Sequence, residues 1–503
     1  MKDYSLKAML QDVDFGDIDG LFDPNLSRYF LDFGYSDQII NKDIFFVIGR
    51  KGCGKSAIYN YVNSKQEGGD FICSNMSFKE FPFEKFLQLS DDDFARPNQY
   101  QSIWRNIILS QFAKLVCIDE KKNVTNNYRD LYEYVEYHFG SNIVDLHKEI
   151  TKSATKSNAG LLIGNKAAGG VSIGFESAKD KTLGLEMGNI SQINSRLEDV
   201  LCGYLSTAET SPYIIQFDQL DDNYTTYINR EEYFQSIISL FKTIYDVNMT
   251  FRQKRIKAKA VVYLRSDIYY SINSFDSESA RWQHFLMPVN YAILSRSDWR
   301  NPKLLQILNK RIATSDTKFA GLENPFATVF DNTVLDLKEN GRRQDPFRYI
   351  VHRTFHRPRD LIQFCIHIQN EVRDKNDFYY QTIKDAETKY SVWLLSEIEN
   401  ELAPMVKEIQ TLYEFLRLLG QKAFSLADFK RKYANFEKKV NMDPEVLLKL
   451  LYKFGIIHNL QFKQGSVEMY SIVRNENSVF NRDLKIELHP GFSQGLYNTK
   501  FMA

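Results

Sequence analysis

Short apolar runs alternate with longer amphipathic stretches along the first part of the chain. Ile44–Ile48, Tyr213–Phe217 and Ala260–Leu264 are almost uninterrupted apolar runs of strand length. Strands that are buried on both faces of a parallel sheet show this pattern, and the helices that connect them cover the faces. The chain is therefore predicted to have an α/β fold, in which helices cover a parallel sheet.

The last part of the chain follows a different pattern. Ile409–Leu419 has helical periodicity, Ser425 can cap a second helix, and Pro444 suits the first turn of a third. Two apolar segments, Ile456–Leu460 and Met469–Val473, could be strands around a Gly-containing turn. Three helices followed by a hairpin predict a winged-helix-like domain at the C-terminus.

The segment from Gly49 to Ser56 fits the pattern G-x-x-x-x-G-K-[ST] of a phosphate-binding loop, and it lies between a predicted strand and a predicted helix. In such a loop the backbone N–H groups surround phosphate oxygens, the lysine reaches the β and γ phosphates, and the serine hydroxyl holds Mg²⁺. We expect Lys55 and Ser56 to take these roles. No Asn-Lys-x-Asp guanine motif follows, which favours ATP over GTP. The predicted nucleotide-binding residues are Gly49, Arg50, Lys51, Gly52, Cys53, Gly54, Lys55, Ser56 and Ala57.

An acidic element follows the second apolar run. Asp218 comes directly after Phe217, as expected of a carboxylate that holds Mg²⁺ through water from the carboxyl end of the neighbouring strand. Asp221 is the candidate for orienting the attacking water, with Asp222 behind it. Gln219 stands where many ATPases carry the glutamate of an Asp-Glu pair. The alternative is an Asp-rich surface turn after a core strand.

Two arginines are candidates for contacting the γ phosphate. Arg265 ends the third apolar run, at the position of a γ-phosphate sensor in AAA+-like enzymes, and guanidinium groups bind phosphate bidentately. Its alternative role is an ion pair with Asp267. Arg359 follows a proline at a predicted helix start, from which it could reach the phosphate, with Arg357 in reserve. The alternative for both is pairing with nearby acids.

Composition bears on the partners and the cellular compartment of the protein. The 64 basic and 64 acidic residues balance, so contact with nucleic acid would need a local patch. Five scattered cysteines indicate free thiols in a reducing compartment. No signal-like segment or run of about 18 apolar residues is found, so we expect a cytoplasmic protein without membrane contact.

Two segments could contact nucleic acid. Five of the eight residues in Arg252–Lys259 are basic, although a solvated stretch before a strand explains them more simply. The third helix of the winged-helix-like domain carries Glu445, Lys449 and Lys453 among leucines, which favours protein contact over DNA reading.

Residues 141–195 are richer in Ser, Gly, Ala and Lys, with short apolar runs between glycines, such as Leu183–Met187. This pattern predicts a β-hairpin-like arm inserted in the core, or a flexible arm. A lone hairpin is marginal in water, so the arm is expected to serve assembly or partner contact.

The phosphate-binding loop, the acidic element after Phe217, the strand end at Arg265 and the Arg357–Leu361 segment together resemble bacterial P-loop ATPases. These are relatives of the KAP and STAND NTPases and, more distantly, of origin-recognition AAA+ proteins, and the resemblance covers about residues 25–385. It implies an ATPase core, a helical lid and often a winged helix. The expected division is a lead-in at 1–40, a P-loop ATPase core at 41–295, a helical lid at 296–400 and the winged-helix-like domain at 401–503.

The resemblance also implies an ATP-hydrolysing, homo-oligomeric switch that controls a protein effector encoded elsewhere, in bacterial antiviral defence. Such enzymes often complete their site with an arginine from a neighbouring subunit, for which Arg281, Arg296 and Arg311 are candidates. The chain lacks the membrane helices of KAP proteins, and Gln219 leaves the hydrolysis rate open. The alternative function is a non-catalytic, ATP-dependent scaffold or DNA-binding loader.

Overall fold

The computed structural model describes most of the chain, namely residues 2–68, 71–79, 86–87, 98–139, 182–207, 211–220, 230–272, 277–293, 298–339, 342–403, 405–420, 422–463 and 466–497. Two compact units account for it. The first comprises Met1–Leu31, Gly52–Ala57 and Asn290–Ala503, and the second comprises Asp32–Lys51 and Ile58–Val289.

The second unit contains a five-stranded parallel sheet. Its strands are β1 (Phe46–Gly49), β2 (Ile72–Ser77), β3 (Tyr213–Asp218), β4 (Ala258–Arg265) and β5 (Leu286–Pro288), in the order β2-β3-β4-β1-β5. The three apolar runs of the sequence are the three central strands, which confirms the predicted fold class. The expectation that the acidic strand neighbours the strand before the phosphate-binding loop is wrong, because β4 lies between β1 and β3.

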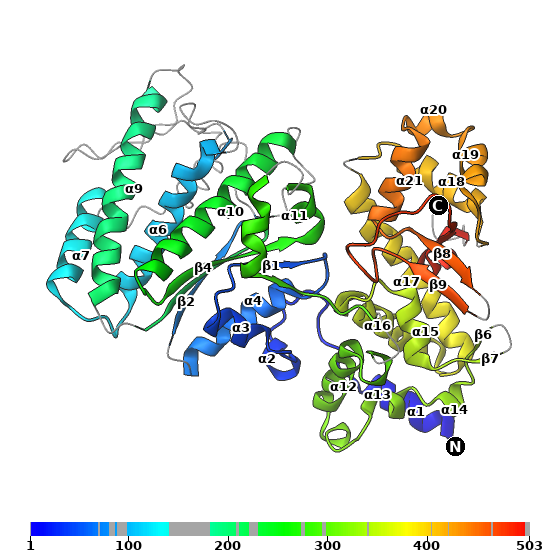
Figure 1. The fold of residues 1–503 in the computed structure, drawn as a ribbon. Helices are drawn as coiled ribbons and strands as arrows, with labels where there is room; N and C mark the ends of the chain where they lie inside the picture. Colours follow the sequence, from blue (N-terminus) through cyan, green and yellow to red (C-terminus); the bar gives the residue numbers. More distant parts are fainter. Residues whose placement is uncertain are drawn as a thin grey trace, which may run out of the picture. The chain divides into compact units, whose positions relative to one another are not determined.

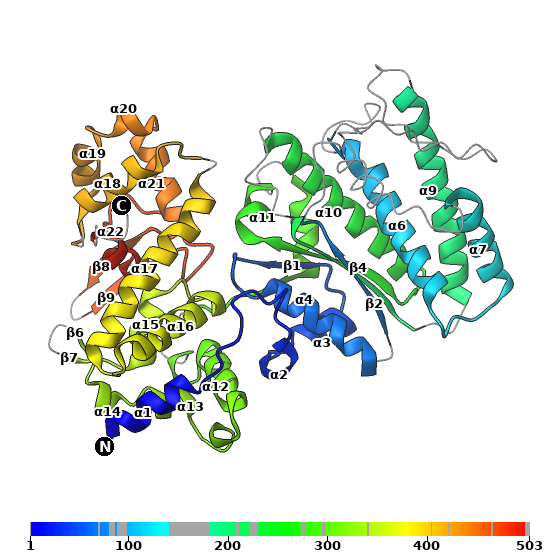
Figure 2. The ribbon, with the colours of Figure 1, turned by 180° about the vertical axis from the view of Figure 1, so that it is seen from behind.

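Helices cover both faces of this sheet (Figure 1 and Figure 2). On one face lie α6 (Gln101–Ile118) and α10 (Arg230–Gln253), with α7 (Asn126–Phe139) and α9 (Thr182–Thr207) packed beyond them. On the other lie α3 (Tyr35–Asn41) and α4 (Lys55–Ser64). The short α11 (Ser266–Ile272) follows β4, and the 3-10 segments Lys65–Gly68, Asn98–Tyr100 and Ser277–Phe285 complete the described elements.

Side chains that alternate along the strands divide between the two faces. Phe46, Ile215 and Val262 belong to an apolar core with residues of α6 and α10. The ring of Phe241 in α10 stacks on Phe46 at 4.4 Å, and the indole N–H of Trp104 in α6 donates to a carbonyl of α10 at 3.0 Å. This face therefore holds the sheet and its helices together mainly through aromatic packing.

The expected β-hairpin-like arm at 141–195 lies largely outside the described residues. Its strand at Leu183–Met187 is wrong, because α9 begins at Thr182. Farther along α9, Leu197, Leu201 and Tyr204 are buried at intervals of three and four residues. This helical spacing packs one stripe of α9 against α6 and α7, and it explains why this part of the segment is helical.

The first unit is mostly helical. Its elements before residue 403 are α1 (Lys2–Gln11), α2 (Leu26–Tyr29), the 3-10 segments Asp298–Arg300 and Thr317–Phe319, α12 (Lys303–Ser315), α13 (Pro325–Val329), α14 (Asn332–Leu335), the β6–β7 ladder (Lys338–Glu339 and Arg342–Arg343), α15 (Pro346–Arg353), α16 (Pro358–Lys375) and α17 (Tyr380–Leu402). The long pair α16 and α17 packs together over most of its length. The side-chain amide of Gln369 in α16 donates to the carbonyls of Leu10 and Val13, which anchors the N-terminal segment on this helix.

Within its described residues, the C-terminal part of the first unit has four helices, then an antiparallel sheet and a last short helix. Its helices are α18 (Ile409–Leu419), α19 (Leu426–Tyr433), the short α20 (Glu437–Val440) and α21 (Pro444–Lys453), followed by β8 (Ile457–Lys463), β9 (Ser466–Tyr470), β10 (Lys485–Leu488), a 3-10 segment (Pro490–Phe492) and α22 (Ser493–Tyr497). Ser425 and Asp428 form a capping box, and Asp443 caps α21. The antiparallel sheet has the order β10-β8-β9, so β10 is a strand that the sequence pattern missed. No helix within the described ranges is long and apolar enough to cross a membrane.

Candidate nucleotide site

Three predicted site residues share one edge of the sheet in the second unit. Gly49 ends β1, Arg265 ends β4 and Asp218 ends β3. Gly49 and Arg265 are register partners on neighbouring strands, and β3 pairs with the other side of β4. Since the carboxyl ends of parallel strands face the same way, the structure brings these residues to one edge, where ligands bind in open α/β sheets.

Asp218 is a buried carboxylate, with 2% of its surface exposed. Burial, and next the charge of Asp218, raise the pKa of the Tyr59 hydroxyl far above its usual value. The neighbouring strand β2 contacts the same position, because Ser77 is the register partner of Asp218 and the N–H of Phe78 donates to the Asp218 carbonyl at 3.0 Å. A carboxylate at this strand end has the oxygen chemistry that Mg²⁺ prefers.

The residue after Asp218 has an unusual backbone. Gln219 adopts a left-handed conformation, with φ of 63°. Its side-chain oxygen accepts a hydrogen bond from the Ser77 hydroxyl, so the amide is directed toward β2. An amide cannot accept a proton from water as a carboxylate can. Asp221 and Asp222 lie outside the described residues.

Arg265 is paired in the structure. Its Nε and Nη2 donate to the two carboxylate oxygens of Asp267 at 3.0 and 2.7 Å, and 7% of its side chain is exposed. The alternative role considered for Arg265, pairing with Asp267 at the start of α11, is therefore present. A sensor role would require the guanidinium to contact phosphate in addition to this pair or in exchange for it.

The remainder of the phosphate-binding loop belongs to the first unit. Gly52 and Gly54 have φ of 79° and 90°, which glycine adopts without strain. Such turns aim successive backbone N–H groups to one side and form a concavity for anions. A Cβ placed on Gly54 would meet nothing closer than the Tyr291 hydroxyl at 4.0 Å, so space remains there. Lys55, with 8% exposure, starts α4.

Cys53 lies within the same loop and is buried. Burial raises the pKa of its thiol, an effect that the nearby Lys55 charge partly offsets. A protonated, buried thiol is a poor nucleophile. Cys53 therefore contributes packing to the loop.

Arg359 contacts the loop directly. Its backbone N–H donates to the Gly52 carbonyl at 3.3 Å, and a Cβ on Gly52 would lie 3.1 Å from the Arg359 Cβ. Its guanidinium lies 3.6 Å from Glu397, and its Nε has no acceptor within the part of the chain that the structure describes. In contrast, Arg357 is 2% exposed and donates to both oxygens of Asp360 at 2.9 and 2.7 Å. The Arg357 side chain is therefore used in a structural ion pair, whereas the Arg359 guanidinium has a hydrogen-bond donor left beside the loop.

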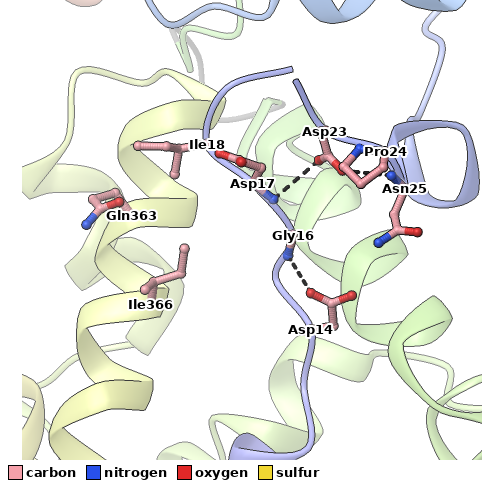
Figure 3. Close-up of a pocket in the computed structure, with 9 residues that line it drawn as sticks. All are labelled: Asp14, Gly16, Asp17, Ile18, Asp23, Pro24, Asn25, Gln363 and Ile366. Carbon is pink, nitrogen blue, oxygen red and sulfur yellow. Dashed lines mark hydrogen bonds between the residues drawn. The ribbon is translucent and has the colours of Figure 1, made fainter. Parts of the chain in front are cut away.

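The N-terminal segment also reaches this loop. A Cβ on Gly20 would lie 2.7 Å from the Ala57 Cβ, so the two backbones are in close contact. Residues on both sides of Gly20 line a pocket of about 400 Å³ between the N-terminal segment and α16 (Figure 3). Its walls are lined by Asp14, Gly16, Asp17, Ile18, Asp23, Pro24, Asn25, Gln363 and Ile366.

Arg311 of α12 anchors this acidic segment. Its guanidinium donates to the Phe15 carbonyl and stacks at 4.1 Å on the Tyr29 ring. Burial lowers the pKa of Arg311 to about 10, against the opposing charges of Asp23, Asp14 and Asp17. This buried arginine is therefore not placed to act on a neighbouring subunit. Of the other two candidates, Arg281 is exposed and Arg296 lies outside the described residues.

Sequence reasoning missed several residues around the site. Gln216 and Tyr263 form a buried network beside Asp218, and Gly20 and Tyr291 approach the loop. Gln216 could have been noticed in the sequence, since it is an amide in the middle of an apolar strand. Gly20 and Tyr291 could not, because they come from segments far from the loop in sequence.

Comparisons with known proteins add two findings. Residues 302–399, which span α12 to most of α17, match the family described as FunZ-associated C-terminal helical domain. Among solved structures, the chain is similar to the Orc1 protein of Aeropyrum pernix in complex with DNA, at 10% identity and a TM-score of 0.34, over 96% of this chain and 95% of that one. No curated protein matches the chain. Because so low a TM-score does not establish a common fold, the fold assignment rests on the strand order and the loop.

Proposed function

We propose that this chain binds ATP with Mg²⁺ through the loop Gly49–Ala57. The observation that carries the proposal is the conformation of the loop. Gly52 and Gly54 both have positive φ, between a strand that ends at Gly49 and a helix that starts at Lys55. Backbone N–H groups in this arrangement, followed by a helix N-terminus, favour the binding of phosphate.

Each residue has a role in this proposal. Lys55 contacts the β and γ phosphates, Arg359 adds a second cation from α16, and Arg265 senses the γ phosphate from the tip of β4. Ser56 and Asp218 supply the hydroxyl and carboxylate oxygens that suit Mg²⁺. Mg²⁺, when bound, would offset charge on the β and γ phosphates.

Hydrolysis is proposed to be slow. Gln219 cannot take a proton, and its amide is held by Ser77. Activation of the water is assigned to Asp221, three residues after Asp218. The contact between Gln219 and Ser77 also favours the second candidate function, an ATP-dependent scaffold or DNA-binding loader with negligible turnover.

The proposed biological role is an oligomeric, cytoplasmic switch that controls a protein effector in bacterial antiviral defence. The resemblance of the sequence to bacterial P-loop ATPases supports it, together with the need of such enzymes for an arginine from a second subunit. Light scattering with and without ATP tests the assembly. A monomer under both conditions, with normal turnover, would contradict it.

Lys55→Ala tests nucleotide binding. Loss of one charge-assisted contact to phosphate should weaken Mg²⁺–ATP binding by about 10- to 100-fold, measured by titration calorimetry. Lys65→Ala is the matched control, because Lys65 is an exposed lysine just after the same helix. The proposal fails if both variants bind ATP like the unmodified protein.

A further inference from the structure

The inner strand β3 contains a buried amide, although apolar packing alone would not require one at this position. Gln216 is 0% exposed and lies between Ile215 and Phe217, which point into the apolar core. It is two residues before Asp218, so both side chains lie on the same face of the strand. Burying an amide costs free energy unless its hydrogen bonds are satisfied, so this side chain must have partners.

Gln216 has partners on three other elements. Its Nε2 donates to the Tyr59 carbonyl of α4 at 3.1 Å and to Asn75 Oδ1 of β2 at 2.8 Å, with Cys73 Sγ at 3.3 Å. Its Oε1 accepts a hydrogen bond from the Tyr263 hydroxyl of β4. Both ends of the amide are thus used, and a buried network that is satisfied in this way fixes the orientation of its members.

Two tyrosines of the network lie near enough to the candidate Mg²⁺ carboxylate for its charge to affect them. The rings of Tyr59 and Tyr263 meet edge to face, with centroids 5.6 Å apart. Burial is the largest cause that raises the pKa of both hydroxyls, and the charge of Asp218 raises them further. Both hydroxyls therefore stay neutral near Asp218, and the network adds no charge to it.

The elements joined by Gln216 carry the predicted site residues. Tyr59 lies one turn after Lys55 in α4, Tyr263 lies two residues before Arg265 in β4, and Asp218 ends β3 itself. A change in the distance between α4 and either strand would therefore move a phosphate or Mg²⁺ contact. Partners of this indirect kind commonly tune metal affinity by about 10- to 100-fold.

We propose that Gln216 is a positioning residue for the Mg²⁺–nucleotide site. From β3, the strand that carries Asp218, it holds α4 through Tyr59 and β4 through Tyr263 at fixed distances. This inference rests on the proposed nucleotide binding. It predicts that Gln216 matters for Mg²⁺ affinity more than for attachment of the nucleotide itself.

The test compares Gln216→Met with Asn248→Leu. Asn248 is also a buried amide, 2% exposed, whose two ends bond the backbone of Ala260 at 2.8 Å each. It joins α10 to β4 away from Asp218, so its loss should destabilise the fold without reaching the site. Binding of a fluorescent ATP analogue is measured against Mg²⁺ concentration and in EDTA, together with the melting temperature.

Both variants should melt at a lower temperature. For Gln216→Met alone, the Mg²⁺ concentration for half-maximal binding should rise about tenfold, while affinity in EDTA changes less than about twofold. Equal Mg²⁺ dependence in the two variants would overturn the positioning role and leave nucleotide binding intact. Absence of nucleotide binding by the unmodified protein would instead overturn the proposed function and this inference with it.

Tyr263→Phe provides a second route if Gln216→Met does not fold, because it removes a single hydroxyl from the same network. It should raise the Mg²⁺ requirement in the same direction by a smaller factor. A Mg²⁺ dependence like that of the unmodified protein in a folded Tyr263→Phe would contradict the proposal.

Discussion

The two faces of the five-stranded sheet are equally buried but chemically different. Toward α6 and α10, Phe46, Ile215 and Val262 join an apolar core of aromatic and aliphatic side chains. Toward α4, Gln216 and Tyr263 are also 0% exposed but are joined by directed hydrogen bonds. Apolar packing tolerates small displacements, whereas a satisfied polar network specifies distances. The face that specifies distances is the one that carries Asp218.

The strongest test of this difference is Phe241→Ala on the apolar face. The Phe241 ring is fully buried, stacks on Phe46 at 4.4 Å and lies 5.3 Å from the Trp282 ring. Its removal should lower the free energy of unfolding by about 3–5 kcal/mol, measured by urea denaturation. Nucleotide affinity, measured well below the unfolding transition, should be unchanged. A large loss of affinity in the folded variant would mean that the two faces are not separate in function.

Tyr263→Phe should have a smaller effect on stability. The variant leaves the buried Oε1 of Gln216 without its donor, which costs about 1–3 kcal/mol. The same denaturation experiment measures it, with Tyr269→Phe as a control on another buried tyrosine. A Tyr263→Phe protein as stable as the unmodified one would show that the hydroxyl is replaceable, for instance by water.

The smallest effect is expected from the thiol of Cys73 on the network face. Burial raises the pKa of Cys73 from 9.0 to about 12. The folded state therefore keeps this proton after the unfolded chain has lost it, and stability falls as the pH rises from 9 toward 12. By pH 9.5 the loss should be about 1 kcal/mol or less, and Cys73→Ala should lack it. The free energy of unfolding of both proteins is measured between pH 7.5 and 9.5. If it depends on pH in the same way in both, Cys73 does not cause the loss.

The sequence predicted those elements that are determined by local pattern and backbone conformation. The apolar runs are strands, and two glycines of the loop, Gly52 and Gly54, have positive φ. The sequence pattern was misleading where the structure favoured by neighbouring residues differs from the structure that tertiary packing imposes. Short apolar runs between glycines suggested hairpins at Leu183–Met187, yet these residues belong to α9, which begins at Thr182.

Long-range partners could not be derived from the sequence. Arg311 was considered for a subunit interface, but the carbonyl of Phe15 and the ring of Tyr29 hold it, almost 300 positions earlier in the chain. Likewise, the two γ-phosphate candidates near residue 358 were separated only by geometry. Asp360 takes both hydrogen bonds of Arg357, and Gly52 contacts Arg359.

The left-handed backbone at residue 219 limits which side chains the position can accept. With φ of 63°, Gly or Asn would be favoured and Val or Ile would be strained. Glutamate and glutamine differ little in this respect, and their codons differ only in the first base. A single nucleotide change would therefore place a carboxylate beside Asp218 without altering the turn, so the gene is one mutation away from the Asp-Glu pair that many ATPases carry at this position.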